Sequence, residues 1–298
     1  MKAKLTVVLS VLSTAVFAGN VCTWTGNGGD GKFSTGANWD TAPVSANGDL
    51  LYFPVGSDDA VSALTAENDI EGLSVAAIRT HGHNNSVFTL NGKAITLTGA
   101  AAAVCPEIPA ATVISNYTAF VLNVPLTVDR GGGNADMRFF GQEFTANAKI
   151  TVANVAKLYL HGRLGVAYAS YIGEAERYPS AALGAHFNAP FEAPDTIVYE
   201  RIGNNCGSQT VTFNAKLTAK EFSSAGNTHD SISRLAFPGN DIGKVCFTGD
   251  SLFLDVAEAL GPDTVICDTK NGNGWMWTGT FYLAENTHQT INRLDGNG

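Results

Sequence analysis

Short runs of alternating apolar and polar residues cover most of the chain, and clusters of Gly, Asn, Asp and Pro separate them. Clear examples of these runs are residues 50–53, 87–90, 94–97 and 157–160. Alternation with a period of two is typical of strands with one buried face, and the clusters are typical of turns. Two short helices are expected at 167–171 and 256–260, too short to be stable without tertiary packing. The pattern predicts an all-β fold.

A weak internal repeat occurs within this pattern. Four copies share apolar residues that alternate on both sides of an Asn, and they span residues 120–128, 144–152, 185–193 and 211–219. A looser copy at 88–97 contains one extra residue. Asn tolerates a left-handed backbone and hydrogen-bonds its own turn, and a Pro shortly after it favours a bend. Each copy therefore predicts a strand, a corner and a second strand.

The spacing of the repeat predicts how the copies stack. The central residues are Asn123, Asn147, Asn188 and Asn214, which lie 24, 41 and 26 residues apart. Coils of this length suit a β-solenoid, and self-similarity at such a period is its usual signature. The 41-residue interval is either one coil with an insertion near 168–179 or two coils. We therefore expect a right-handed parallel β-helix, with a β-sandwich or jelly roll as the alternative fold.

The first 18 residues have the form of a signal peptide. Lys2 and Lys4 precede an apolar stretch over residues 5–17, and small residues at Val16 and Ala18 fit cleavage after residue 18. The apolar stretch is short for a membrane-spanning helix, although an uncleaved anchor is the alternative. The remaining chain divides into a predicted cap and first coil over residues 19–56 and β-helix repeats over 57–298.

The segment after the predicted cleavage site resembles a known type of secreted protein. It contains Trp24-x-Gly26, a Gly-rich turn, Ser34-x-x-x-Asn38-Trp39, Pro43 and Gly48-Asp49 before an apolar strand. This order is similar to the start of passenger proteins with autotransporter-associated β-strand repeats. The resemblance covers residues 22–100 and continues only through the repeat.

The resemblance implies a parallel β-helix on the cell surface, associated with the outer membrane, or released from it. The chain departs from the family pattern because it has five cysteines and no C-terminal barrel. We therefore read it as the N-terminal portion of a larger structural, adhesin-like protein. The partners expected are surface glycans or proteins of a host or neighbouring cell, and no cofactor is expected.

Composition limits the classes of partner. Without Lys2 and Lys4, 16 basic residues face 27 acidic ones, a formal charge of −11. Nucleic acids and anionic membranes bind basic patches, so neither is an expected partner, and the mature segment is not expected to insert into a membrane. Charged residues make up 15% of the chain, less than the usual quarter.

The five cysteines are Cys22, Cys105, Cys206, Cys246 and Cys267, and none lies in a C-x-x-C pair. Export permits disulfides, and adjacent coils of a solenoid would bring together Cys246 and Cys267, which are 21 residues apart. These two form the expected bridge. The alternative is that most of the cysteines are small buried apolar residues.

Charged and metal-binding motifs are sparse. Asp129-Arg130 and Asp136-x-Arg138 flank a glycine loop, and such groups on the outer face of neighbouring coils would suit a polysaccharide lyase. A charged loop is the commoner explanation, and a fold alone never implies activity. Residues 27–31 and the pair His81 and His83 suggest metal ligands, but too few converge for a site. We expect no catalytic or metal-binding residues.

Aromatic residues gather near the end of the chain. Trp275 and Trp277 alternate, so both could stack on sugar rings from one face, and Tyr282 follows them. Aromatic residues of strands more often belong to the core or cover an edge. The expected function is thus structural or adhesive and not enzymatic. The alternatives are a carbohydrate-active β-helix enzyme, similar to a polysaccharide lyase, and a carbohydrate-binding module.

Overall fold

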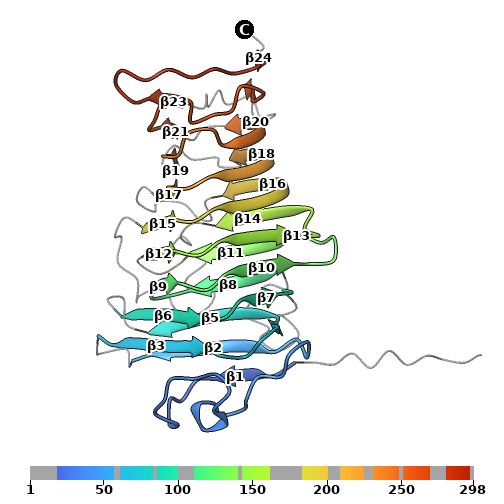
Figure 1. Cartoon of the computed structure of the whole chain (residues 1–298), viewed down its shortest axis with the longest axis vertical. Helices are drawn as coiled ribbons and strands as arrows, with labels where there is room; N and C mark the ends of the chain where they lie inside the picture. Colours follow the sequence, from blue (N-terminus) through green and yellow to red (C-terminus); the bar gives the residue numbers. More distant parts are fainter. Residues whose placement is uncertain are drawn as a thin grey trace, which may run out of the picture.

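The chain winds into a stack of about eight turns with parallel strands, so the prediction of an all-β solenoid is confirmed (Figure 1). The computed structural model describes residues 19–56, 61–82, 86–99, 111–139, 143–161, 183–200, 209–224, 231–247, 251–268 and 280–295. The N-terminal and C-terminal coils lie at opposite ends of the stack.

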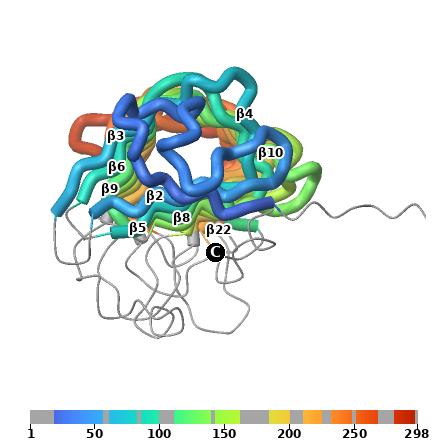
Figure 2. Tube along the Cα trace, turned by 90° about the horizontal axis from the view of Figure 1, so that it is seen from below, coloured from blue at the N-terminus to red at the C-terminus, as the bar shows by residue number. Residues whose placement is uncertain are grey.

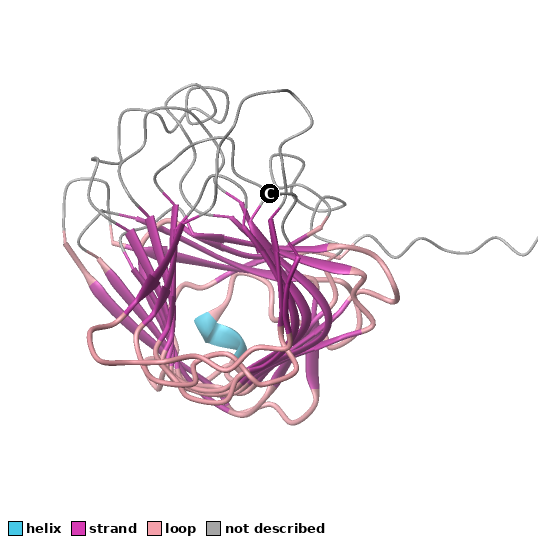
Figure 3. Cartoon of the chain, turned by 90° about the horizontal axis from the view of Figure 1, so that it is seen from above, coloured by secondary structure: helices cyan, strands magenta, loops and turns pink. Residues whose placement is uncertain are grey.

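Three faces surround a single core, and Figure 3 shows their strands as the sides of a ring. The first face is a nine-stranded sheet, and the second and third faces join in a fifteen-stranded sheet. The first face consists of β3 (Ala63–Asn68), β6 (Val87–Gly92), β9 (Ala119–Leu122), β12 (Glu143–Ala146), β15 (Leu183–Phe187), β17 (Gln209–Phe213), β19 (Ser231–Leu235), β21 (Ser251–Leu254) and β23 (Thr280–Leu283).

The other two faces differ in the length of their strands. The second face begins with the short strands β4 (Leu73–Val75), β7 (Ile95–Leu97), β10 (Leu126–Asp129) and β13 (Ile150–Ala153). The third face contains β1 (Val21–Thr23), β2 (Leu50–Val55), β5 (Ala77–Gly82), β8 (Thr112–Asn116), β11 (Ala135–Phe139), β14 (Lys157–His161), β22 (Val265–Asp268) and β24 (Arg293–Asp295). Three longer strands run across the corner between these faces, namely β16 (Phe191–Glu200), β18 (Leu217–Ser224) and β20 (Asp241–Phe247).

The predicted repeat forms a ladder of side-chain amides along one corner. The Nδ2 of Asn123 donates to Oδ1 of Asn91 at 2.8 Å, and that of Asn147 donates to Asn123 at 2.9 Å. Asn188 donates to Asn147 at 2.9 Å and Asn214 to Asn188 at 2.8 Å. Because Asn188 bonds Asn147 directly and β15 pairs with β12, the 41-residue interval is one coil.

The core is a column of aromatic and aliphatic side chains that stack from coil to coil. Phe88, Phe120 and Phe144 occupy one inward row, with ring centroids 5.0 and 5.5 Å apart. The next coil places Ala185 opposite Phe144 and Phe187 opposite Ala146. The Phe ring thus moves from the row of Phe144 to the row of Ala146. The side-chain volume in each coil is maintained, as close packing requires.

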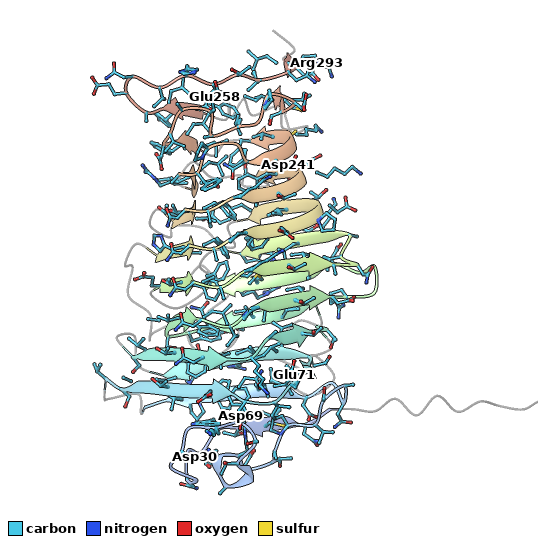
Figure 4. All side chains as sticks on the ribbon, viewed as in Figure 1. Asp30, Asp69, Glu71, Asp241, Glu258 and Arg293 are labelled. Carbon is cyan, nitrogen blue, oxygen red and sulfur yellow. The ribbon has the colours of Figure 1, made fainter. Side chains whose placement is uncertain are left out.

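The N-terminal segment crosses the end of the stack (Figure 2), and an aromatic cluster within it covers the core. Trp24, Phe33 and Trp39 are buried and pack on Phe53 of β2, with ring centroids 5.6–5.9 Å from that ring. The loop also bonds the second coil, because Ser34 donates through its backbone N and Oγ to Asp69. Figure 4 labels Asp69 at this end of the stack, next to Asp30. A single 3₁₀ turn, η1 (Gly36–Asn38), lies in the same loop.

The opposite end leaves core positions less covered. Among the described strands, β23 pairs with β21 alone and β24 with β22 alone. Leu283 and Leu294 continue inward-facing rows, yet they are 56% and 71% exposed. The two ends of the described stack therefore differ in how well the core is covered.

Two expectations need comment. The short helix expected at 256–260 is wrong: this segment is a turn that bonds neighbouring coils, and Glu258 has a left-handed φ of 50°, which a right-handed helix excludes. The helix expected at 167–171 lies outside the described residues. The sandwich alternative is excluded because every strand pair of the described segments is parallel, apart from an isolated Trp24–Trp39 bridge.

We predict that Asn147→Ala destabilises the protein by about 1–2 kcal/mol, because it removes two amide hydrogen bonds of the ladder, each worth about 1 kcal/mol. Chemical denaturation of both proteins measures this difference. Asn134→Ala is the matched control, because Asn134 is exposed and its side chain forms no hydrogen bond in the described structure. Equal stability of the two variants would contradict a stabilising role for the ladder.

Candidate functional site

The outer side of the third face carries a compact group of polar side chains over two neighbouring coils. Asp136 and Arg138 of β11 are two residues apart, so the pleat turns both outward. His161 of β14 is the direct strand partner of Arg138. Arg138 Nη2 donates to Asp136 Oδ2 at 2.7 Å, and His161 Nε2 lies 3.4 Å from Asp136 Oδ1. We call these three residues the β11–β14 cluster.

The charged side chains of this cluster are buried, and this burial affects the pKa of Asp136. Side chains of the three residues are only 7–10% exposed, and both faces of β8 and β11 are buried. Burial by itself raises the pKa of Asp136, but hydrogen bonds from His161 and then Arg138 outweigh this effect, so the pKa lies below its ordinary value. Asp136 is therefore a carboxylate that holds two neighbouring cationic or donor groups in place.

The cluster does not form a nucleophilic triad. Ser115 of β8 is the strand partner of Arg138 and faces the same way as His161. Two strand spacings, about 9.6 Å, separate Ser115 from His161 along the sheet. A serine nucleophile must lie within hydrogen-bonding distance of its base. The arrangement is instead a buried carboxylate that pairs with a guanidinium and an imidazole.

The neighbouring motif Asp129-Arg130 serves the backbone. Arg130 Nε donates to Asn134 O at 3.0 Å, and its Nη1 donates to the carbonyls of Thr98 and Gly99. Asp129 accepts hydrogen bonds from Gly131 N and from the side chain of Asn154. Both charged groups thus hold the loop between the second and third faces.

The glycine-rich turn at 27–31 is likewise satisfied from within. Asp30 accepts hydrogen bonds from Thr35 Oγ1 at 2.6 Å, Lys32 N at 3.1 Å and Asn38 Nδ2 at 2.7 Å. These bonds, that of Thr35 first, lower the pKa of Asp30. The turn is organised by its own donors.

Histidines were the other candidate ligands. His81 packs edge-on against Tyr117, with ring centroids 5.9 Å apart, and His83 lies outside the described residues. The part of the chain that the structure describes contains no group of three or more His, Cys, Asp or Glu residues able to hold a metal ion.

The aromatic candidates near the C-terminal end are partly described. Tyr282 is 46% exposed and stacks on Phe253, with centroids 4.4 Å apart and planes 12° apart. The guanidinium of Arg234 lies 4.8 Å from the other side of Phe253 and bonds both carboxylate oxygens of Asp255. Arg234, Phe253 and Tyr282 therefore form one outward column on the first face. Trp275 and Trp277 lie outside the described residues.

The two cysteines that the sequence spacing predicts as a pair lie next to each other in the structure. Cys246 of β20 and Cys267 of β22 are direct strand partners, and both are thiols here. Cys22 is a third buried thiol, on β1. Cys105 and Cys206 lie outside the described residues.

Sequence analysis identified Asp136 and Arg138 but missed His161 as their neighbour. The sequence does contain a signal for this neighbour. His161 follows Asp136 by 25 residues, close to the 24-residue spacing of the nearby Asn repeat. One coil length therefore relates the two positions. The column of Arg234, Phe253 and Tyr282 was missed for the same reason, since its members come from three coils.

Comparison with protein-family models, with curated proteins and with solved structures gave no significant match. No helix among the described segments is long and apolar enough to cross a membrane.

The lowered pKa of Asp136 predicts a loss of stability in acid. A depressed carboxyl pKa stabilises the folded state above the pKa of the unfolded chain, and this contribution disappears as the pH falls towards the folded value. We expect unfolding midpoints measured from pH 6 down to about pH 2 to fall less steeply for Asp136→Asn than for the parent. Asp241→Asn, an exposed carboxylate on the second face, is the control and should retain the parent slope.

An equal acid slope for the parent and Asp136→Asn would contradict this role of the cluster. Because Asp136→Asn also leaves Arg138 without its ionic partner, its stability should be lower than the parent's at neutral pH as well. The slope and the neutral value therefore report the same interaction of the Asp136 carboxylate with its partners.

Proposed function

We propose that this chain is an exported structural protein of the autotransporter-passenger type, which acts as a stiff, adhesin-like rod at the cell surface. One observation supports it most: the same corner, core row and strand pairing continue from coil to coil, and the Asn91–Asn214 ladder bonds five successive coils. Backbone hydrogen bonds of such a stack run along its length, so extension or bending works against many of them together.

The organisation of the polar groups is consistent with this role. Asp129, Arg130 and Asp30 bond their own loops, and Asp136 bonds Arg138 and His161. Charged side chains in these places stabilise corners and a buried sheet. The outward column that ends in Tyr282 offers an aromatic surface for contact with glycans or proteins of another cell.

Export and surface location can be tested in a Gram-negative host that expresses the full chain. We expect the mature protein to begin at Gly19, because the predicted cleavage follows Ala18. Edman sequencing identifies the first residue, and protease treatment of intact cells measures surface exposure. Ala18→Asp should block cleavage, since signal peptidase needs a small residue there. A chain that retains its first 18 residues in the cytoplasm would refute the proposal.

A carbohydrate-active enzyme is the second candidate, and the β11–β14 cluster favours it. A carboxylate, a guanidinium and an imidazole on the outer side of adjacent coils are groups that could exchange protons with a sugar polymer. Their burial favours the structural role over this one, because a substrate must reach the atoms that it reacts with.

An activity screen separates the two candidates. The purified chain is incubated with neutral and uronic-acid polysaccharides, and new reducing ends and unsaturated products are measured. If the cluster is catalytic, Arg138→Gln should lower the rate at least 100-fold, while Arg293→Gln, at an exposed position, leaves it unchanged. Thermal unfolding confirms that both variants fold. Lack of product from every polymer removes the enzyme candidate.

A further inference from the structure

Cys246 and Cys267 occupy adjacent positions near the less covered end of the stack. As strand partners on β20 and β22, their Cα atoms are one strand spacing apart, about 4.8 Å. A disulfide joins Cα atoms that are about 4.4–6.8 Å apart. The pleat turns both side chains to the same face, and the two thiols are in hydrogen-bonding contact.

We infer that Cys246 and Cys267 form a disulfide that joins successive coils, and that this bond forms before β20 and β22 pair. The first part was expected from spacing, and the strand register now supplies its geometry. The order of events is new. The inference rests on the proposed export, because structural disulfides persist in oxidising compartments.

Burial is the reason for the order of events. Cys246 is 4% and Cys267 is 9% exposed once the strands have paired. An oxidant must bring its own sulfur against one of these thiols, and the folded sheet leaves little room for that approach. In the unfolded chain both thiols are open to solvent.

Ionisation acts in the same direction. Burial first, and then the neighbouring Cys267, raise the pKa of the Cys246 thiol from 9.0 to about 12. The thiolate is the attacking species, so fewer Cys246 thiolates are available in the folded protein, and the higher nucleophilicity of a more basic thiolate recovers only part of this loss. Attack by Cys246 on an oxidant should therefore be slower in the folded protein than in the unfolded chain.

The reaction is an exchange with a protein disulfide or an oxidised low-molecular-weight thiol. The thiolate of one cysteine attacks a sulfur of the oxidant, which breaks the S–S bond of the oxidant and releases one thiolate. The second cysteine, after losing its proton, attacks the mixed disulfide and releases the other. The chain loses two protons and two electrons, and the oxidant is reduced to two thiols.

The bridge would join two coils near the last strand that the structure describes. Among the described strands, β24 pairs with β22 alone, and Leu294 on β24 is 71% exposed. A bond between β20 and β22 would keep the coil below β24 in register.

The test compares two orders of treatment of the full chain. One sample is oxidised with glutathione disulfide while unfolded and then refolded, and the other is refolded under reducing conditions and then oxidised. Free thiols are alkylated in denaturant and the chain is digested with trypsin. Residues 245–270 form one tryptic peptide that contains both cysteines, so the bridge appears as a peptide lighter by two hydrogens without alkylation.

We expect this bridged peptide in the first sample, and slower formation in the second, because both thiols are buried there. The bridged protein should also unfold at a higher denaturant concentration, and reductant should abolish the difference. Cys246→Ser and Cys267→Ser should each prevent formation of the bridged peptide. Cys22→Ser should not, because Cys22 lies on β1 at the other end. The bridge is refuted if both thiols of the peptide are alkylated in the first sample, or if they are bonded to Cys105 or Cys206 instead. The proposed order of events is refuted if the bridged peptide forms at the same rate in both samples.

Because this experiment uses purified chain and added oxidant, its result does not depend on location in the cell. A chain that forms the bridge in solution but stays in the cytoplasm of the expressing host contradicts the export proposal alone. An exported chain whose peptide 245–270 keeps two free thiols contradicts the bridge alone.

Discussion

The parallel, in-register stacking of coils constrains every other feature of this molecule. Each residue lies one strand spacing from its counterpart in the next coil, so side chains must tolerate near copies of themselves. Phe rings and aliphatic side chains do so by packing, and Asn does so because its amide has both a donor and an acceptor. Like charges at this distance would repel by about 1–3 kcal/mol. The low content of charged residues follows from this constraint, as does the pairing of Lys149 with Glu192 and of Lys244 with Glu221 across coils.

The same constraint separates polar groups that support the stack from those that face outward. Asp136 pairs with Arg138 and His161 across two coils within a sheet that is buried on both faces. Removing one partner of such a group is unfavourable because the others are left buried and uncompensated. The column of Arg234, Phe253 and Tyr282 becomes more exposed towards its end and is open to contact. One group therefore lies within the sheet, and the other lies on the outer surface of the first face.

Sequence reasoning predicted the parts of the fold that repeat. The Asn corners and the alternating strands beside them recur often enough to reveal the coil, and the ladder confirms their stacking. It failed where one coil differs from the next. The segment 256–260 has a helix-like apolar pattern, but its carbonyls and amides bond neighbouring coils, so a tertiary contact overrides a local preference. The joining of Asp136 with His161 depends on the register between coils, which no single segment contains.

The ladder along the Asn corner has a direction. Every amide from Asn123 to Asn214 donates towards the N-terminal end, and every amide from Asn91 to Asn188 accepts from the C-terminal side. Their dipoles therefore add head to tail, as peptide dipoles do in a helix. One edge of the molecule carries an electrical polarity along its length, with partial positive charge at Asn91 and partial negative charge at Asn214. The next position after Asn214 is Ala236, which has no side-chain donor, so the negative end of this array terminates at the surface beside an apolar residue.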